Sequence, residues 1–345
     1  MIHSNPVITG TTARFVWRGA DPPEIIGDFN GWMSTGALRF NPAGAHESHA
    51  SLDLLPDAYM EYAFVRGEQR IPDPLNDRSR PNGIGQVNDY FSMPRWRSTD
   101  LVRARRGVAH GTINSFTIRN QALIVGGRRK IWLYAPPVEK SVRLLVVLDG
   151  QDYLRKARLA VIVDNLIALN RIRPIAMAFV EHGRQSRVIE YASNDATAAF
   201  IVKEVIPLAA RHLNLETDGQ RPCRCGVLGA SMGGLMALHL GLLYPDFFAS
   251  VYSQSGAFRL ESILGRSLLE GLIPSVPVSD VIIRMEWGQY EGLRDANKTT
   301  CEALDKRGYS VTHREYSGGH NWISWRNELA HGLEALFPPV RKSIV

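Results

Sequence analysis

The chain has 345 residues, of which 45% are hydrophobic and 21% charged, and its three cysteines are too few for a disulfide framework. This length allows two domains with a large core, and the longest apolar runs, such as residues 144–148, are too short to span a bilayer. We therefore expect a globular protein that does not associate with membranes. The first ten residues lack a basic region followed by an apolar core, so we expect no secretory signal and a cytoplasmic location.

The formal net charge of +6 raises the question of an anionic partner. The basic residues are scattered, apart from a cluster at 95–106, which argues against nucleic acid. A basic surface equally suits a small anionic substrate, because it raises the local concentration of anions. Cys223 and Cys225 are not followed by a second Cys/His pair at zinc spacing. We therefore expect no metal site and no cofactor, and we place Cys225 in a buried strand.

The N-terminal part of the chain contains short segments that alternate apolar and polar residues, each bounded by Gly, Pro, Asn or Asp. Strands are predicted at 11–17, 24–32, 48–55 and 59–67, and a loop rich in proline and glycine at 70–86. Short strands at this spacing are typical of a β-sandwich. The sequence therefore predicts a β-sandwich domain over 1–95 and a linker over 96–109.

The pattern changes at about residue 110. Two strands that we expect to pair lie at 111–120 and 128–137, and further strands are predicted at 143–150, 174–181, 224–230, 248–255, 280–288 and 309–318. Helices are predicted between and after them, at about 156–170, 195–213, 232–243, 259–271, 292–307 and 322–337. Most of these strands are continuous apolar runs, as in a parallel sheet that is buried on both faces. Strict alternation of strand and helix predicts a doubly wound α/β domain over 110–345.

One serine lies in a glycine-rich turn of this domain. Residues 229–233, Gly-Ala-Ser-Met-Gly, fit the motif G-x-S-x-G, with a predicted strand before it and a helix after it. This context is typical of a nucleophile elbow, in which the serine occupies a strained turn and the flanking glycines let strand and helix pass closely. A helix N-terminus also favours developing negative charge. We therefore predict that Ser231 is a nucleophile, against the alternative of a simple packing turn.

A serine nucleophile needs a base, and in this architecture the chain order is serine, acid, histidine. His239 lies on the helix directly behind the serine, and His313 lies inside a strand. His320 follows two glycines in the loop between the last strand and the last helix. The position that the chain order requires is therefore occupied by His320, which we predict to be the base.

The acid should follow the strand at 280–288. Glu286 still lies in that strand, Asp295 lies at the start of the next helix, and Glu291 lies in the loop between them. Glu291 is favoured on position, with Glu286 and Asp295 kept as alternatives. The acid would fix the imidazole tautomer and stabilise its charged form.

An oxyanion intermediate needs two N–H donors, one from the residue after the nucleophile and one from a loop after an early strand. Met232 follows Ser231, and Gln151 follows Gly150 in the loop after the strand at 143–150. We predict that the backbone amides of Met232 and Gln151 form this pair.

Several motifs together resemble one family. They are VLDGQDY (147–153), SRVIEY (186–191), GASMGGL (229–235), YSQSG (252–256), MEWGQYE (285–291) and GGHNWISWR (318–326). In this order, over most of residues 110–338, they resemble the enterochelin (ferric enterobactin) esterases, within the broader esterase D-like hydrolases. The resemblance implies an α/β-hydrolase fold preceded by an immunoglobulin-like (early-set) β-sandwich, no catalytic metal, and hydrolysis of esters in catecholate siderophores.

Carried over by residue, the resemblance implies that Ser231 is nucleophile, His320 base and Glu291 acid. Arg187 and Glu190 match an Arg-x-x-Glu segment beside the substrate pocket, and Trp322 belongs to the last motif. We therefore expect these three residues to contact substrate. The expected partner is a small-molecule ester, such as an anionic ferric siderophore, while the oligomeric state is left open.

Two alternatives stay open. The segment 24–32 also resembles glycogen-binding-like modules, in which Trp32 would stack on a sugar, although a core tryptophan is the commoner role. The chain would then be a feruloyl or acetyl esterase that acts on a glycan. In the other alternative, the protein is a non-catalytic binding protein on a hydrolase scaffold.

Overall fold

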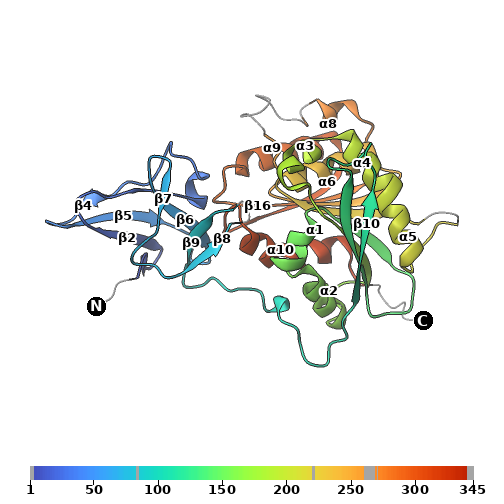
Figure 1. Ribbon diagram of the computed structural model, residues 1–345, viewed down its shortest axis with the longest axis horizontal. Coiled ribbons are helices and arrows are strands. Elements are labelled where there is room, and N and C mark those ends of the chain that lie inside the picture. Colours follow the sequence, from blue (N-terminus) through green and yellow to red (C-terminus); the bar gives the residue numbers. More distant parts are fainter. Residues whose placement is uncertain (1–3, 83–84, 220–221, 260–268, 270, 340–345) are drawn as a thin grey trace. The chain divides into compact units, whose positions relative to one another are not determined.

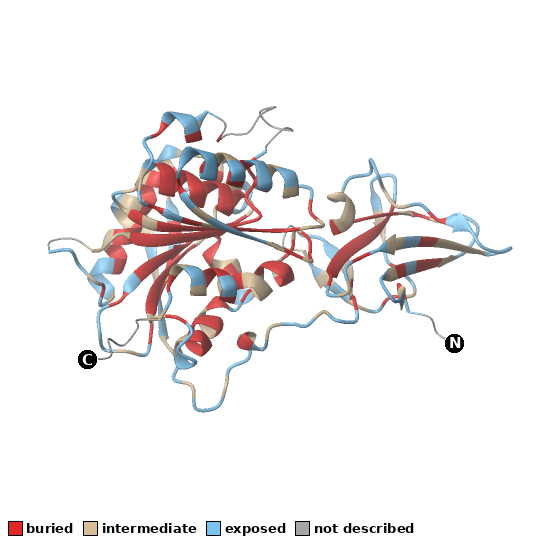
Figure 2. Ribbon diagram, turned by 180° about the vertical axis from the view of Figure 1, so that it is seen from behind, coloured by how far each residue is buried: buried red, intermediate tan, exposed pale blue. Residues whose placement is uncertain are grey.

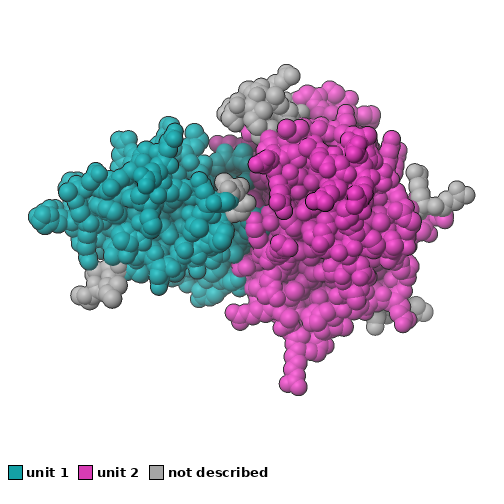
Figure 3. All heavy atoms as spheres, in the orientation of Figure 1, with its two compact units in different colours: residues 1–98, 287–294, 315–324 teal, residues 99–286, 295–314, 325–345 magenta. Residues whose placement is uncertain are grey.

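The computed structural model describes residues 4–82, 85–219, 222–259, 269 and 271–339. The chain divides into two compact units (Figure 3). The first unit contains residues 1–98 together with 287–294 and 315–324, and the second unit contains 99–286, 295–314 and 325–345. Two segments from the C-terminal third of the chain are therefore part of the same unit as the N-terminal strands, so the units are not contiguous stretches of sequence.

The N-terminal strands of the first unit form two antiparallel sheets. One has the order β1-β2-β5-β4, and the other has the order β3-β6-β9-β8, with β7 paired to β6. Their bounds are β1 Val7–Thr9, β2 Thr12–Arg18, β3 Glu24–Gly27, β4 Asn41–Pro42, β5 Glu47–Asp53, β6 Tyr59–Arg66, β7 Gln69–Ile71, β8 Ser79–Pro81 and β9 Val87–Ser92, with a short 3₁₀ helix η1 at Asp28–Asn30. The predicted β-sandwich is confirmed.

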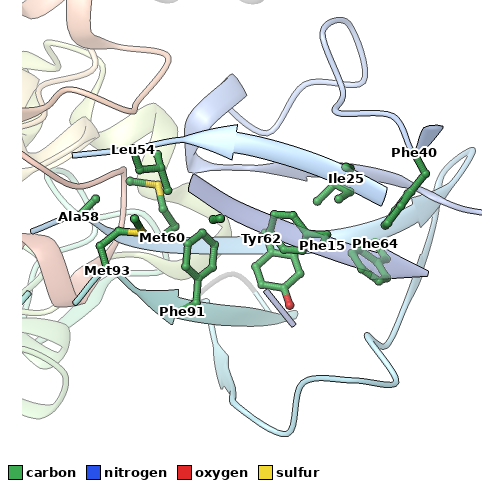
Figure 4. Close-up of a cluster of buried hydrophobic side chains, with 12 residues drawn as sticks. Phe15, Ile25, Phe40, Leu54, Ala58, Met60, Tyr62, Phe64, Phe91 and Met93 are labelled. Carbon is green, nitrogen blue, oxygen red and sulfur yellow. The ribbon is translucent and has the colours of Figure 1, made fainter. Parts of the chain in front are cut away.

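Aromatic side chains fill the space between the two sheets (Figure 4). Phe15 of β2 contacts Tyr62 of β6 with ring centroids 4.9 Å apart and edge to face, and Phe64 and Phe91 complete the group. Such edge-to-face pairs add to the stability that burial alone provides. The inward residues are spaced two apart along β6, as a strand requires.

The predicted loop at 70–86 is wrong in part. It contains β8 and part of β7, and β9 follows at 87–92. The strands β7 and β8 are short and rich in polar residues and proline, so their own pattern does not indicate a strand. Their conformation is determined by pairing with longer strands, β7 with β6 and β8 with β9.

The second unit is built on a sheet with the order β10-β11-β13-β12-β14-β15-β16-β17. The strands are β10 Thr112–Arg119, β11 Arg128–Ala135, β12 Arg143–Val147, β13 Ile175–Val180, β14 Cys225–Ala230, β15 Phe248–Gln254, β16 Ile282–Gly288 and β17 Ser310–Tyr316. The first two strands form an antiparallel hairpin, and the central strands are parallel. Each predicted strand is found within a few residues, and the α/β-hydrolase prediction is confirmed.

Helices lie on both faces of this sheet, with α2 and α10 on one face and α6 and α9 on the other (Figure 1). Their bounds are α1 Gly150–Arg155, α2 Leu159–Ala168, α3 Arg187–Tyr191, α4 Asp195–Phe200, α5 Ile206–His212, α6 Met232–Leu243, α8 Leu272–Ser275, α9 Arg294–Arg307 and α10 Trp322–Leu336. The central strands are buried as a result (Figure 2). No described helix is long and apolar enough to cross a membrane.

Three predicted helices need comment. The one at 156–170 is found as the shorter α2, whose N-cap Arg158 has a left-handed φ of 56°, and the short helix α1, which was not predicted, precedes it. The one at 195–213 consists of α4, a π-helical stretch η4 at Ile201–Val205, and α5. The one at 259–271 falls almost wholly outside the described residues.

Candidate active site

Ser231 lies at the junction of β14 and α6, as the motif predicts. Its φ of 58° and ψ of −121° are unfavourable for a residue with a side chain. The junction leaves no room for larger neighbours, since a Cβ on Gly229 would lie 2.2 Å from the carbonyl oxygen of Gly233. The amide of Ser231 donates to the carbonyl of Gln254 on β15 at 2.9 Å, which stabilises the turn. The predicted strained turn is therefore present.

A buried ion pair lies behind this turn. Asp149, which is 1% exposed, accepts hydrogen bonds of 2.7 Å from both Nε and Nη2 of Arg187. Arg187 Nη2 also donates to the carbonyl of Ala230 at 3.2 Å, and a Cβ on Gly233 would lie 2.9 Å from Asp149 Oδ2. Two parallel hydrogen bonds of this kind fix the orientation of both side chains. Asp149 was not among the predicted site residues, because an aspartate by itself carries no sign of the arginine that folding brings beside it.

The two predicted amide donors lie at helix N-termini. Met232 is the first residue of α6, and Gln151 is the second residue of α1. The first N–H groups of a helix lack acceptors within the helix, so they can bind an anion. The preceding strands β14 and β12 are adjacent and parallel, so both helices begin at the same edge of the sheet. Gly150 is required here, because a Cβ would lie 2.5 Å from the backbone of Phe179.

In the first unit, the loops at 289–293 and 317–321 bring Glu291 and His320 together. Nδ1 of His320 lies 3.2 Å from Oε2 of Glu291, within hydrogen-bond distance. The side chain of Glu291 is fully buried, whereas that of His320 is 27% exposed. A carboxylate at Nδ1 favours the tautomer that carries its proton there, which leaves a lone pair on Nε2 for use as a base.

The alternative acids have other surroundings. Glu286 lies within β16 and accepts from Arg284 Nε at 3.0 Å and from the hydroxyl of Tyr252. Burial raises the pKa of Glu286 to about 7. Asp295 is exposed and is the second residue of α9. Among the three candidates, Glu291 is the one with a recorded hydrogen bond to His320.

Glu190 and Trp322 are the remaining predicted residues, and they lie on different units. Glu190 on α3 is 6% exposed and pairs with Arg129, and it also accepts from Ser186 Oγ at 3.2 Å. Trp322 is the first residue of α10 and is half-buried. Contact of Arg187, Glu190 and Trp322 with a substrate stays a prediction.

Trp32 is half-buried and packs on the face of β3 and β6 opposite to the inter-sheet core, rather than inside that core. Its ring packs against Ile26, Ala63 and Val65, and the guanidinium of Arg70 lies 4.9 Å from the ring centroid. Its side-chain N–H donates to a carboxylate within the same unit. These contacts are those of a packed tryptophan.

Comparison with known proteins gives the following. A family model described as "Putative esterase" matches residues 123–336. The iron(III) enterobactin esterase of Dickeya dadantii (strain 3937) is 29% identical, over 93% of this chain and 86% of that protein. A crystal structure of the enterobactin esterase from Shigella flexneri in the presence of enterobactin has a TM-score of 0.73 at 20% identity, covering 96% of this chain and 94% of that one.

A ferulic acid esterase from Anaeromyces mucronatus is more distant, with a TM-score of 0.56 at 13% identity, covering 70% of this chain and 97% of that one. The structural likenesses support the fold, and that to the Shigella flexneri structure extends over nearly the whole chain. The resemblance seen in the motifs is confirmed by these relatives. Because the family model matches more than half of its residues, the chain belongs to this esterase family and is a carboxylic ester hydrolase with an α/β-hydrolase fold.

Proposed function

We propose that the protein hydrolyses ester bonds of a catecholate siderophore through Ser231, His320 and Glu291. The observation that carries this proposal is the hydrogen bond of 3.2 Å between His320 Nδ1 and a fully buried Glu291, in a chain with a strained serine turn. A buried acid that orients a histidine is the arrangement used to activate a serine.

In the proposed reaction, His320 Nε2 removes the proton of Ser231 as its Oγ attacks the ester carbonyl. The tetrahedral oxyanion accepts hydrogen bonds from the amides of Met232 and Gln151. His320 then gives its proton to the leaving alkoxide, and an acyl–serine ester remains. Water, deprotonated by the same imidazole, attacks this ester and releases the acid. Glu291 stabilises the imidazolium that forms in both steps.

The substrate class is proposed from the relatives and from charge. The Dickeya dadantii relative is named for enterobactin and matches over 93% of this chain. A net charge of +6 favours an anionic substrate such as an iron-loaded catecholate. We propose Arg187, Glu190 and Trp322 as residues near that substrate, and a cytoplasmic location that cell fractionation would test.

A substrate panel tests this proposal. Purified protein and its Ser231→Ala variant are incubated with enterobactin, with its ferric complex, and with feruloylated xylan, and the products are identified by mass spectrometry. Release of dihydroxybenzoyl-serine units by the wild type alone is expected. Release of ferulate alone would favour the glycan esterase, and equal product from both proteins would contradict the serine mechanism.

A further inference from the structure

The buried carboxylate of Asp28 is the starting point. Asp28 begins η1, directly after β3, and is 1% exposed. Its Oδ2 accepts from the amide of Glu61 at 2.8 Å and from Nδ2 of Asn321 at 2.9 Å, and its Oδ1 accepts from Nε1 of Trp32 at 3.1 Å. Burial, and then the nearby carboxyl of Glu61, raise the pKa of Asp28 well above its usual value, while the three N–H donors act in the opposite direction.

Asn321 is the residue after His320, and both of its side-chain atoms are used. Nδ2 donates to Asp28, and Oδ1 accepts from the amide of Ser324 at 2.9 Å, which is the bond of a helix N-cap for α10. The orientation of this amide is thus fixed from two sides. Its backbone N–H also donates to the carbonyl of Gly319 at 3.0 Å, which closes a tight turn around His320.

Gly319, the residue before His320, also lies against Asp28. A Cβ on Gly319 would lie 2.1 Å from the carboxyl carbon of Asp28, so the backbone of the loop rests directly on this carboxylate. The amide of Tyr59 in β6 donates to the carbonyl of Ser317 at 3.2 Å, which attaches the beginning of the same loop to the sandwich. Both neighbours of His320 are therefore held by one N-terminal side chain.

The loop that carries Glu291 is attached in a similar way. The hydroxyl of Tyr290 accepts from the amide of Leu55 at 2.8 Å. Gly292 approaches Gly31 so closely that a Cβ on Gly31 would lie 3.1 Å from its Cα. Both residues that flank Glu291 therefore contact the N-terminal strands and their turns.

From these contacts we infer that the N-terminal sandwich is part of the catalytic machinery, with Asp28 as a positioning residue that holds the His320 loop through Asn321. The inference deepens the proposed function and rests on it. A catalytic base must lie within about 0.5 Å of its working position, and a misplacement of 1 Å can cost about a hundredfold in rate. Two of the loop's residues, Gly318 and Gly319, have the least restricted backbones, so its contacts with the sandwich add the precision that its own turn lacks.

The test measures kcat and KM on p-nitrophenyl acetate for six variants. Asn321→Ser keeps an oxygen that can cap α10 but is too short to reach Asp28, and Asp28→Ala removes the carboxylate. Both are expected to lower kcat by about ten- to a hundredfold with KM changed less than about twofold. Asp28→Asn keeps an accepting oxygen for Asn321 and is expected to restore kcat to within about fivefold of the wild type.

Two variants serve as controls. Trp32→Phe removes another donor to the same carboxylate and is expected to leave kcat within about twofold, since it does not touch the loop. The double variant Asp28→Ala/Asn321→Ser is expected to be no slower than either single one, because the two changes break the same bond. His320→Ala tests the underlying function: unchanged hydrolysis in this variant would overturn the proposed mechanism itself.

If His320→Ala is inactive while Asn321→Ser and Asp28→Ala keep wild-type kcat, the positioning role is overturned and the mechanism stands. The role is equally overturned if the loss of rate in these variants follows the unfolded fraction measured by circular dichroism, or if Asp28→Asn is as slow as Asp28→Ala. A loss of kcat in fully folded variants, with rescue by asparagine, supports it.

Discussion

The serine turn and the histidine loop achieve defined geometry by different means. The turn is constrained within five residues, where a Cβ on Gly229 would meet the backbone of Gly233 at 2.2 Å. The histidine loop is constrained by Asp28, which is 293 positions away from Asn321 in the chain. The tightest constraint on the serine turn is therefore local in sequence, whereas that on the histidine loop comes from a distant part of the chain.

This difference has a practical meaning. Strain at a functional turn persists only where the surroundings determine the backbone. At Ser231 the tightest of these contacts, between Gly229 and Gly233, is local, and a hydrogen bond to Gln254 adds to it. The loops of Glu291 and His320 depend on the folded sandwich. Substitutions in the N-terminal strands should therefore disturb the positions of His320 and Glu291 more than that of Ser231. The following predictions test this distinction.

The largest effect is expected from Ser231→Ala. This change removes the proposed nucleophile and should lower kcat on p-nitrophenyl acetate by about 10⁴-fold or more. Ala relieves no clash and adds none, so the thermal midpoint should stay close to that of the wild type. A rate within tenfold of the wild type would remove the serine turn from the mechanism altogether.

Glu291→Gln should follow, with kcat lowered by about 10²- to 10³-fold. The amide can present an N–H to His320 Nδ1 and so favour the wrong tautomer. Glu286→Gln is the matched control, since it makes the same chemical change at a carboxyl that contacts Arg284 and Tyr252. Its kcat should stay within about fivefold. The reverse outcome, with the control slower, would assign the acid to Glu286.

A pair of glycine substitutions compares the two regions directly. Gly229→Ala and Gly319→Ala should each lower kcat by about tenfold or more, because each added Cβ overlaps existing atoms. Gly44→Ala is the control, since a Cβ there meets nothing within 4 Å. In the double variant with Asn321→Ser, the effect of Gly319→Ala on kcat should be non-additive, because both changes disturb the same loop. The effect of Gly229→Ala on kcat should add to that of Asn321→Ser, because the two sites are independent. Additivity in both would mean that the loop does not depend on Asp28.

The smallest effect concerns pH. Burial raises the pKa of Glu286 from 4.5 to about 7, so the folded protein holds this proton more tightly than the unfolded chain. Its contribution to stability is therefore present below pH 4.5 and is lost as the pH rises through about 7. The variant Glu286→Gln should lack this part of the pH dependence of the free energy of unfolding. Urea unfolding of both proteins between pH 4.5 and 8 gives their free energies of unfolding. If these change with pH in the same way in both proteins, the raised pKa of Glu286 is contradicted.

Much of the second unit could be predicted because its signals are local. Apolar runs fully buried in a parallel sheet, such as residues 225–230, carry their own signature, and the glycines of the serine turn follow from steric limits within a few residues. In the first unit, the chain order of nucleophile, acid and base indicated His320 and favoured Glu291 over Glu286 and Asp295, and the structure contains the hydrogen bond between His320 and Glu291.

The fold class and the strained turn follow from short-range patterns, and the candidate residues follow from motifs and their order in the chain. That β7, β8 and β9 are strands becomes evident only in the folded protein, because their pairing partners determine them. It alone joined Asp149 to Arg187 and Asp28 to Asn321. Each of these bonds links residues far apart in the chain, and an isolated Asp carries no sign of the donor that folding will bring to it.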